Sequence, residues 1–176
     1  MGGIKVLIKM ADLKKSLSKT LGWEGGYAND PKDSGGPTWR GVTLNTYKSY
    51  CRKKGKPVPT IEDLKKLTEA DILDVARTLF WNKIKGDDIK NQSIADLVFD
   101  MVWMSGLGYV RMIQKSLGVS MDGIFGSGTL AALNSQSSPE LFDKLVRQRR
   151  AYLANCNGAK FYLKGWLRRL ESFQYK

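Results

Sequence analysis

Two carboxylates near the N terminus, Glu24 and Asp33, have the residue types that acid–base hydrolysis of a glycosidic bond requires. They are nine positions apart, which along an extended strand is about 30 Å. A Gly-Gly pair at 25–26 and an Asn-Asp-Pro turn sequence at 29–31 lie between them. If these turns fold the segment back, the two carboxylates face each other across about 5–9.5 Å, the separation found in glycosidases.

The residues around this pair suit the same chemistry. Trp23 and Tyr27 flank Glu24 and would lower the local polarity, which raises the pKa of a carboxylic acid toward the value that a general acid needs. Asp33 would then stabilise positive charge, position water or attack the sugar. We also expect hydroxyl groups that hold water or sugar, from Thr38 and Thr43, and a ring face for a sugar, from Trp39.

Each of these residues also has a purely structural interpretation. Glu24 can be a helix-end carboxylate with a structural partner, Asp33 an Asx-turn residue, and Trp39 part of the core. We assign Asp30, which precedes a proline, to the turn. The combination is harder to explain by structure alone, because the five glycines between positions 25 and 41 suit backbone that must approach a ligand closely.

Composition excludes several classes of protein. The chain has 176 residues, of which 42% are hydrophobic and 26% charged, and no apolar run is long enough to span a membrane. There is no histidine, which rules out Ser-His-Asp chemistry and histidine-ligated metals. Cys51 and Cys156 are far apart and do not form a metal motif, so they either pair as one disulfide or, the favoured alternative, stay free. We expect no cofactor.

The net charge of +12 predicts a polyanionic partner, which can be nucleic acid, an acidic membrane surface or an anionic cell-wall polymer. A nucleic-acid partner is disfavoured, because no recognised motif and no arginine-rich tail accompanies the charge. The first ten residues are basic, but Lys5 and Lys9 interrupt their apolar run. We therefore expect synthesis in the cytoplasm without a signal peptide.

Apolar periodicity predicts a mainly α (α+β) fold with one small β-hairpin near the N terminus. One helix should run from Ile4 to Leu21 and the hairpin should occupy 25–41. Two more helices should begin at capping boxes that start with Thr60 and Thr68. The other expected helices are 44–54, 93–104, 108–117, 126–134, 139–155 and 161–172. We expect one domain over 1–176, with sequence segments 1–90 and 91–176.

The glycine-rich stretch resembles the glycoside hydrolase family 108 N-acetylmuramidases of phage endolysins and related bacterial proteins. Their signature is Glu-Gly-Gly-Tyr, Asn-Asp-Pro, Asp before Gly-Gly, and Gly-Ile-Thr. It stands here at 24–27, 29–31, 33–36 and, with Val42 in place of isoleucine, 41–43. The second half is similar to the peptidoglycan-binding-type segment that accompanies the family, at 94–100, 114–119, 122–126, 129–134 and 165–169.

This resemblance implies a lysozyme-like fold and cleavage of the β-1,4 bond between N-acetylmuramic acid and N-acetylglucosamine in peptidoglycan, without metal or organic cofactor. Glu24 would be the catalytic acid, and we expect Asp33 and Thr43 to complete the catalytic set. The expected substrate-binding residues are Tyr27, Asn29, Thr38 and Trp39. We expect a monomer that neither binds nucleic acid nor inserts stably into membranes, and that reaches the periplasmic cell wall after release.

Two departures from the family pattern leave an alternative open. Trp39 and Met104 stand where family members usually carry asparagine. The wider phage-lysozyme pattern of Glu, eight residues, then Asp would place its third member at Trp39, so Thr38 or Thr43 would have to replace it. The alternative function is a catalytically weak or inactive protein that binds the wall or assists secretion on the same fold.

Overall fold

A computed structural model of the chain describes residues 10–23, 25–33 and 35–176. The fold is mainly helical with one small sheet near the N terminus, as the sequence predicts. The strands are β1 (Tyr27–Ala28), β2 (Thr38–Trp39) and β3 (Val42–Thr43). The helices are α1 (Leu13–Leu21), α2 (Leu44–Lys53), α3 (Ile61–Lys65), α4 (Glu69–Ala76), α5 (Gln92–Ser105), α6 (Val110–Leu117), α7 (Ser127–Ser135), α8 (Pro139–Ala154) and α9 (Ala159–Glu171).

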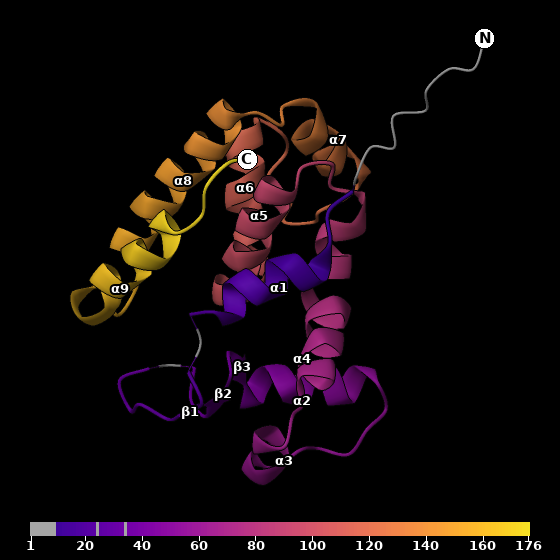
Figure 1. Cartoon of the computed structure of the whole chain (residues 1–176), viewed down its shortest axis with the longest axis vertical. Coiled ribbons are helices and arrows are strands. Elements are labelled where there is room, and N and C mark those ends of the chain that lie inside the picture. Colours follow the sequence, from indigo (N-terminus) through magenta and orange to yellow (C-terminus); the bar gives the residue numbers. More distant parts are fainter. Residues whose placement is uncertain (1–9, 24, 34) are drawn as a thin grey trace.

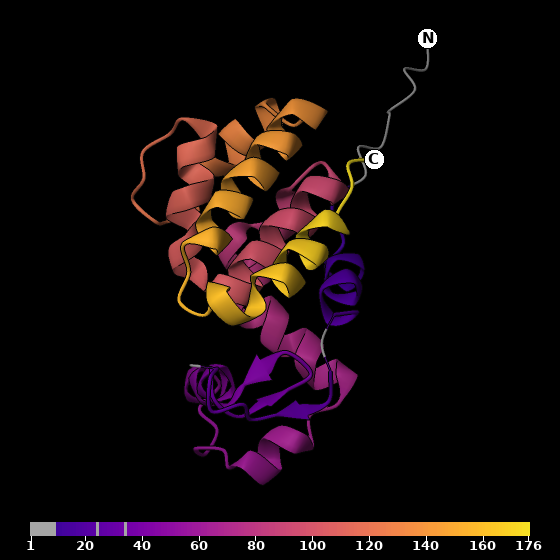
Figure 2. The ribbon, with the colours of Figure 1, turned by 90° about the vertical axis from the view of Figure 1, so that its left-hand side faces the viewer.

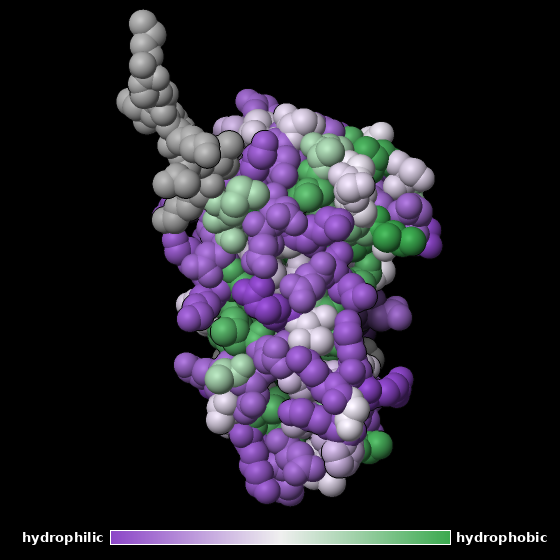
Figure 3. Space-filling view, turned by 90° about the vertical axis from the view of Figure 1, so that its right-hand side faces the viewer, coloured by the Kyte–Doolittle hydropathy of each residue, from purple (hydrophilic) through white to green (hydrophobic). Residues whose placement is uncertain are grey.

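The elements divide the molecule along its long axis. The sheet, α2 and α3 form one end, and α5 to α9 form the other, with α1 and α4 between them (Figures 1 and 2). Helix α5 is at the centre, and most of its residues are buried. The face turned away from α8 and α9 is covered mainly by hydrophilic residues with small separate apolar patches (Figure 3). None of the described helices is both long and apolar enough to cross a membrane.

Helix α1 begins later than its apolar periodicity predicts. Residues 1–9 lie outside the described part, and Met10 to Asp12 are not helical. Asp12 has extended backbone angles, and its side chain accepts a hydrogen bond from the Lys14 N–H, which makes it the N-cap. The prediction of continuous helix from Ile4 is therefore wrong for these residues, because a capping aspartate interrupts the apolar pattern.

The expected hairpin is a three-stranded antiparallel sheet in the order β1-β2-β3. Arg40 and Gly41 alone connect β2 to β3, and both have positive φ angles, +46° and +83°. Two central residues with positive φ are the signature of a type I′ turn, whose twist matches that of the flanking strands. This tight turn adds a third strand that glycine content alone did not predict.

The capping signals are confirmed. Thr60 and Thr68 each form a full capping box, with Asp63 and Asp71 as the acidic partners. Ser138 caps α8, where Pro139 is the first helical residue. Local hydrogen-bonding groups therefore define these three helix starts independently of the surrounding fold.

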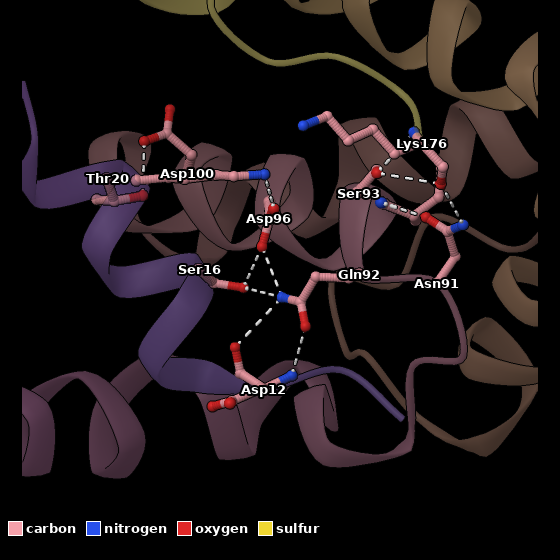
Figure 4. Close-up of polar contacts among 11 residues, drawn as sticks. Asp12, Ser16, Thr20, Asn91, Gln92, Ser93, Asp96, Asp100 and Lys176 are labelled. Carbon is pink, nitrogen blue, oxygen red and sulfur yellow. Dashed lines mark hydrogen bonds and ion pairs between the residues drawn. The ribbon is translucent and has the colours of Figure 1, made fainter. Parts of the chain in front are cut away.

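A ladder of polar side chains joins α1 to α5 (Figure 4). The Asp12 N–H donates to Gln92 at 2.8 Å, the Ser16 hydroxyl donates to Asp96 at 2.7 Å, and the Thr20 hydroxyl donates to Asp100 at 2.9 Å. Each pair is 80 positions apart, so the two helices run parallel with their four-residue spacings in register. Ser16, Thr20 and Asp96 are completely buried. The ladder therefore fixes α1 against α5 in one register.

Asp96 is a fully buried carboxylate of this ladder with three different partner side chains. It accepts hydrogen bonds from Ser16 and Gln92 and pairs with Lys19. We expect Asp96→Ala to lower the free energy of unfolding by about 3 kcal/mol, because it leaves buried donors without an acceptor. Urea unfolding monitored by circular dichroism measures this. The control is Asp143→Ala, which removes an exposed carboxylate from α8; equal, small losses for both variants would contradict the prediction.

Candidate functional site

A cleft of about 560 Å³ lies between the sheet and helices α5, α8 and α9. Figure 2 shows α8 and α9 side by side above the sheet. The cleft residues used below come from the sheet segment (Lys32, Asp33, Thr38, Thr43), from α5 (Asp100, Trp103, Met104, Ser105) and from the C-terminal part (Arg149, Tyr152, Cys156, Tyr162, Trp166, Arg169). Segments from both halves of the chain therefore build the cleft together.

Local hydrogen bonds hold the sheet-side residues in place. The Asp33 carboxylate accepts the Gly35 N–H at 2.9 Å, which forms an Asx-turn. The Thr38 hydroxyl donates to the Gly36 carbonyl at 2.9 Å. Thr43 is the N-cap of α2, and its hydroxyl oxygen accepts the Thr46 N–H at 3.1 Å. Each of these side chains thus has a defined orientation at the edge of the cleft.

A buried ion pair lines the cleft where α1 ends. The Arg169 guanidinium donates to Asp100 at 2.7 Å, and only 8% and 9% of their side-chain surfaces are exposed. Arg169 also donates to the Thr20 carbonyl at 3.2 Å, and the Thr20 hydroxyl donates to Asp100. Because these contacts join α1, α5 and α9, they fix the point at which the chain leaves α1 for the sheet.

Aromatic side chains of α9 form part of the opposite wall. Tyr162 and Trp166 are four residues apart on the helix, and their ring centroids are 5.9 Å apart. The Tyr162 hydroxyl donates to Asp30 at 2.7 Å, which ties α9 to the loop after β1. The Lys32 N–H and this hydroxyl hold the pKa of Asp30 below its usual value, and the same contact raises the pKa of Tyr162. Asp30 therefore makes the predicted turn and also a contact across the fold.

The expected site residues fall into three groups. Glu24 lies outside the described residues, so its expected distance from Asp33 stays a prediction. Asp33, Thr38 and Thr43 line the cleft. Three expected substrate-binding residues do not line it, namely Tyr27, Asn29 and Trp39.

Strand geometry explains the position of Trp39. Successive residues of a strand point to opposite faces, so Thr38 and Trp39 cannot both face the cleft from β2. The Trp39 indole instead donates to the Leu67 carbonyl at 3.2 Å and packs against the core. Tyr27 is exposed with the Lys65 ammonium above its ring, at 4.5 Å from the centroid. Of the two departures from the family pattern, Met104 borders the cleft and Trp39 does not.

Sequence reasoning missed the contribution of α8 and α9. Arg149 and Arg169 lie in basic runs of the sequence, at 147–150 and 164–169, yet both are buried. The four-residue spacing of Tyr162 and Trp166 was the signal that could have revealed an aromatic helix face. Cys51 and Cys156 are both free, in agreement with the favoured alternative, and Cys156 lines the cleft.

Two family models match consecutive parts of this chain. The family model for glycosyl hydrolase 108 matches residues 17–106, and that for a predicted peptidoglycan domain matches residues 109–171. The first match therefore extends through α5, beyond the expected segment boundary at position 90.

A solved structure of SagA from Brucella abortus is similar to this chain, with a TM-score of 0.80 and 32% sequence identity. The similarity covers 90% of this chain and 89% of SagA. No curated protein matches the chain. The family matches indicate a glycoside hydrolase that acts on peptidoglycan, and the chain belongs to the glycosyl hydrolase 108 family.

Proposed function

We propose that this protein is an N-acetylmuramidase that cleaves the β-1,4 bond between N-acetylmuramic acid and N-acetylglucosamine, with Glu24 as the general acid. The observation that carries the proposal is the composite cleft. One side bears a carboxylate and hydroxyl groups from residues 17–106, the glycosyl hydrolase segment. The other side bears aromatic rings from residues 109–171, the peptidoglycan segment. Rings of this kind suit the apolar faces of sugars, while the carboxylate suits an oxocarbenium-like transition state.

The position of Glu24 in the sequence supports its role. It follows α1 by three residues and precedes β1 by three. The polar ladder and the Arg169–Asp100 pair anchor the end of α1 beside the cleft. Strand β2, which follows β1 in the sheet, lines the cleft. Protonation of the glycosidic oxygen by Glu24 would then start bond cleavage.

Asp33 supplies the second carboxylate of the proposed mechanism. One of its oxygens accepts the Gly35 N–H, while the other makes no hydrogen bond to any described residue. A carboxylate held in this way has one oxygen available to the substrate. That oxygen would face developing positive charge or accept a proton from an attacking water.

The two threonines fit a supporting role as acceptors. The Thr38 hydroxyl donates a hydrogen bond to the Gly36 carbonyl, and the Thr43 hydroxyl donates one to the Thr46 hydroxyl oxygen. Each oxygen keeps acceptor capacity, because a hydroxyl has one donor and two lone pairs. Water or a sugar hydroxyl can therefore donate to Thr38 or Thr43, which would orient it beside Asp33.

The bond that is cut can be identified directly. We expect digestion of purified sacculi, followed by borohydride reduction and mass spectrometry, to show new reducing ends on N-acetylmuramic acid. Reduced N-acetylglucosamine ends would instead identify a glucosaminidase. Sacculi that bind the protein but release no reducing ends would favour the non-catalytic wall-binding alternative. By resemblance to the family, the proposal includes an endolysin role, with release from the cytoplasm to the wall.

The first prediction for this mechanism concerns Glu24. Glu24→Gln keeps the shape of the side chain and removes its titrating proton, so we expect the rate of sacculus hydrolysis to fall by about a hundredfold or more. The melting temperature should change little. A matched control is Glu62→Gln, which alters an exposed glutamate at the start of α3. Near-parental hydrolysis by pure Glu24→Gln protein would eliminate Glu24 as the acid.

The second concerns Asp33. Asparagine keeps a side-chain oxygen that can accept the Gly35 N–H, so Asp33→Asn should preserve the turn and remove only the charge. We expect the hydrolysis rate to fall by about a hundredfold, with circular dichroism and the melting curve unchanged. If the folded variant hydrolyses walls at close to the parental rate, Glu24 must act with a water held by Thr38 or Thr43 alone.

The third concerns attraction to the wall. The peptidoglycan segment carries exposed cations on two adjacent helices, at Lys144, Arg147, Arg150, Lys160, Lys164 and Arg168. Raising the salt concentration from about 0.05 to 0.5 M should weaken adsorption to sacculi, because the screening length falls below 10 Å. A pull-down with sacculi measures this. Adsorption that does not change with salt would show that direct contacts, rather than long-range electrostatic attraction, govern binding to the wall.

A further inference from the structure

Arg149 is a buried cation in the wall of the cleft. It lies on α8, only 4% of its surface is exposed, and it lines the cleft. Its guanidinium donates to the Ser105 hydroxyl at 2.8 Å and lies over the rings of Tyr109 and Tyr152, at 4.6 Å and 5.3 Å from their centroids. It makes no ion pair with any carboxylate in the described ranges 10–23, 25–33 and 35–176.

This arrangement is unusual in energetic terms. A guanidinium taken out of water is normally compensated by a carboxylate, as Arg169 is by Asp100 in the same cleft. The two tyrosine rings offset part of the desolvation through cation–π attraction, and one neutral hydroxyl accepts one of its five N–H groups. Arg149 therefore still lacks an anionic partner. An anion can reach it through the cleft.

The neighbouring polar groups are donors as well. The Trp103 indole N–H and the Tyr109 hydroxyl are buried and have no hydrogen-bond partner among the described residues. Burial raises the pKa of Tyr109, although the charge of Arg149 opposes this, so its hydroxyl stays protonated. Trp103 and Ser105 line the cleft with Arg149. At this corner of the cleft, which Arg149, Ser105 and Trp103 line and where Tyr109 contacts Arg149, the polar groups are donors, and none of these four residues carries a carboxylate.

We propose that Arg149 binds a carboxylate of the glycan and so determines which sugar occupies this corner. The inference rests on the proposed function of the same cleft. In peptidoglycan, N-acetylglucosamine carries no carboxylate, whereas the muramic acid residue carries one on its lactyl group or on the peptide attached there. A guanidinium can hold such a group by two parallel hydrogen bonds. The peptidoglycan segment would thus supply a residue that determines specificity.

Four soluble substrates separate the possible sources of the carboxylate. Strands with peptide stems carry peptide carboxylates, while strands stripped by an amidase carry the free lactyl carboxylate. Each is also prepared with its carboxylates converted to amides by carbodiimide and ammonia. We would measure kcat and KM from reducing-end release at 0.5 M salt, which suppresses the general effect of the +12 charge.

The variants are Arg149→Gln and Arg149→Lys, with Arg52→Gln as the control. Arg52 is an exposed arginine of α2 that does not line the cleft. For one of the two strand types, the parent protein should prefer the carboxylate form by about 10- to 100-fold in kcat/KM, mainly through KM. Arg149→Gln should abolish this preference, Arg149→Lys should keep part of it, and Arg52→Gln should keep all of it.

The strand type that shows the preference identifies the source, since only stripped strands expose the lactyl carboxylate. The proposal is overturned if the parent does not distinguish the carboxylate from the amide forms, or if Arg149→Gln slows both forms by the same factor. The substrate comparison on the parent and on Arg149→Lys remains decisive if Arg149→Gln does not fold. If the parent releases no reducing ends from any strand, the proposed function fails, and calorimetry of strand binding by the parent and Arg149→Lys still tests the subsite.

Discussion

The register between α1 and α5 is the constraint on which the other features depend. Ser16, Thr20 and Asp96 are buried, and a shift by one residue would leave their hydrogen-bonding groups without partners in a region that water does not reach. The ladder ends at Thr20, where Asp100 and Arg169 add α9 to the pair. One polar network therefore positions the end of α1, the centre of α5 and the helix that carries the aromatic wall.

The cleft exists because the two family segments pack on each other. The sheet and α5 belong to the segment that matches glycosyl hydrolase 108, while α8 and α9 belong to the peptidoglycan segment. The Asp30–Tyr162 hydrogen bond connects them directly. In this chain the second segment is a wall of the candidate active site, and under the proposed function it supplies rings that stack on sugars and a guanidinium that binds a carboxylate.

On the sheet side, the residues with proposed chemical roles also hold the local structure. Asp33 orders a turn with one oxygen, Thr43 caps α2, and both residues line the cleft. Side chains whose orientation is fixed by a turn or a cap lose little entropy when a substrate binds. The structural and functional interpretations of Asp33 are thus compatible.

The sequence by itself determined the features that depend on short-range interactions. Apolar periodicity and the caps at Thr60, Thr68 and Ser138 specify helices locally, and the motifs from 24 to 43 specify the family. Asp12 as a cap and the alternation of Thr38 and Trp39 were readable from the same local rules. Only the tertiary structure decided that Arg149 and Arg169 are buried in a cleft, because their burial depends on α5 and α1, distant in sequence. Whether a charged side chain on a basic helix is buried depends on the elements that pack against the helix. No local sequence pattern specifies those elements.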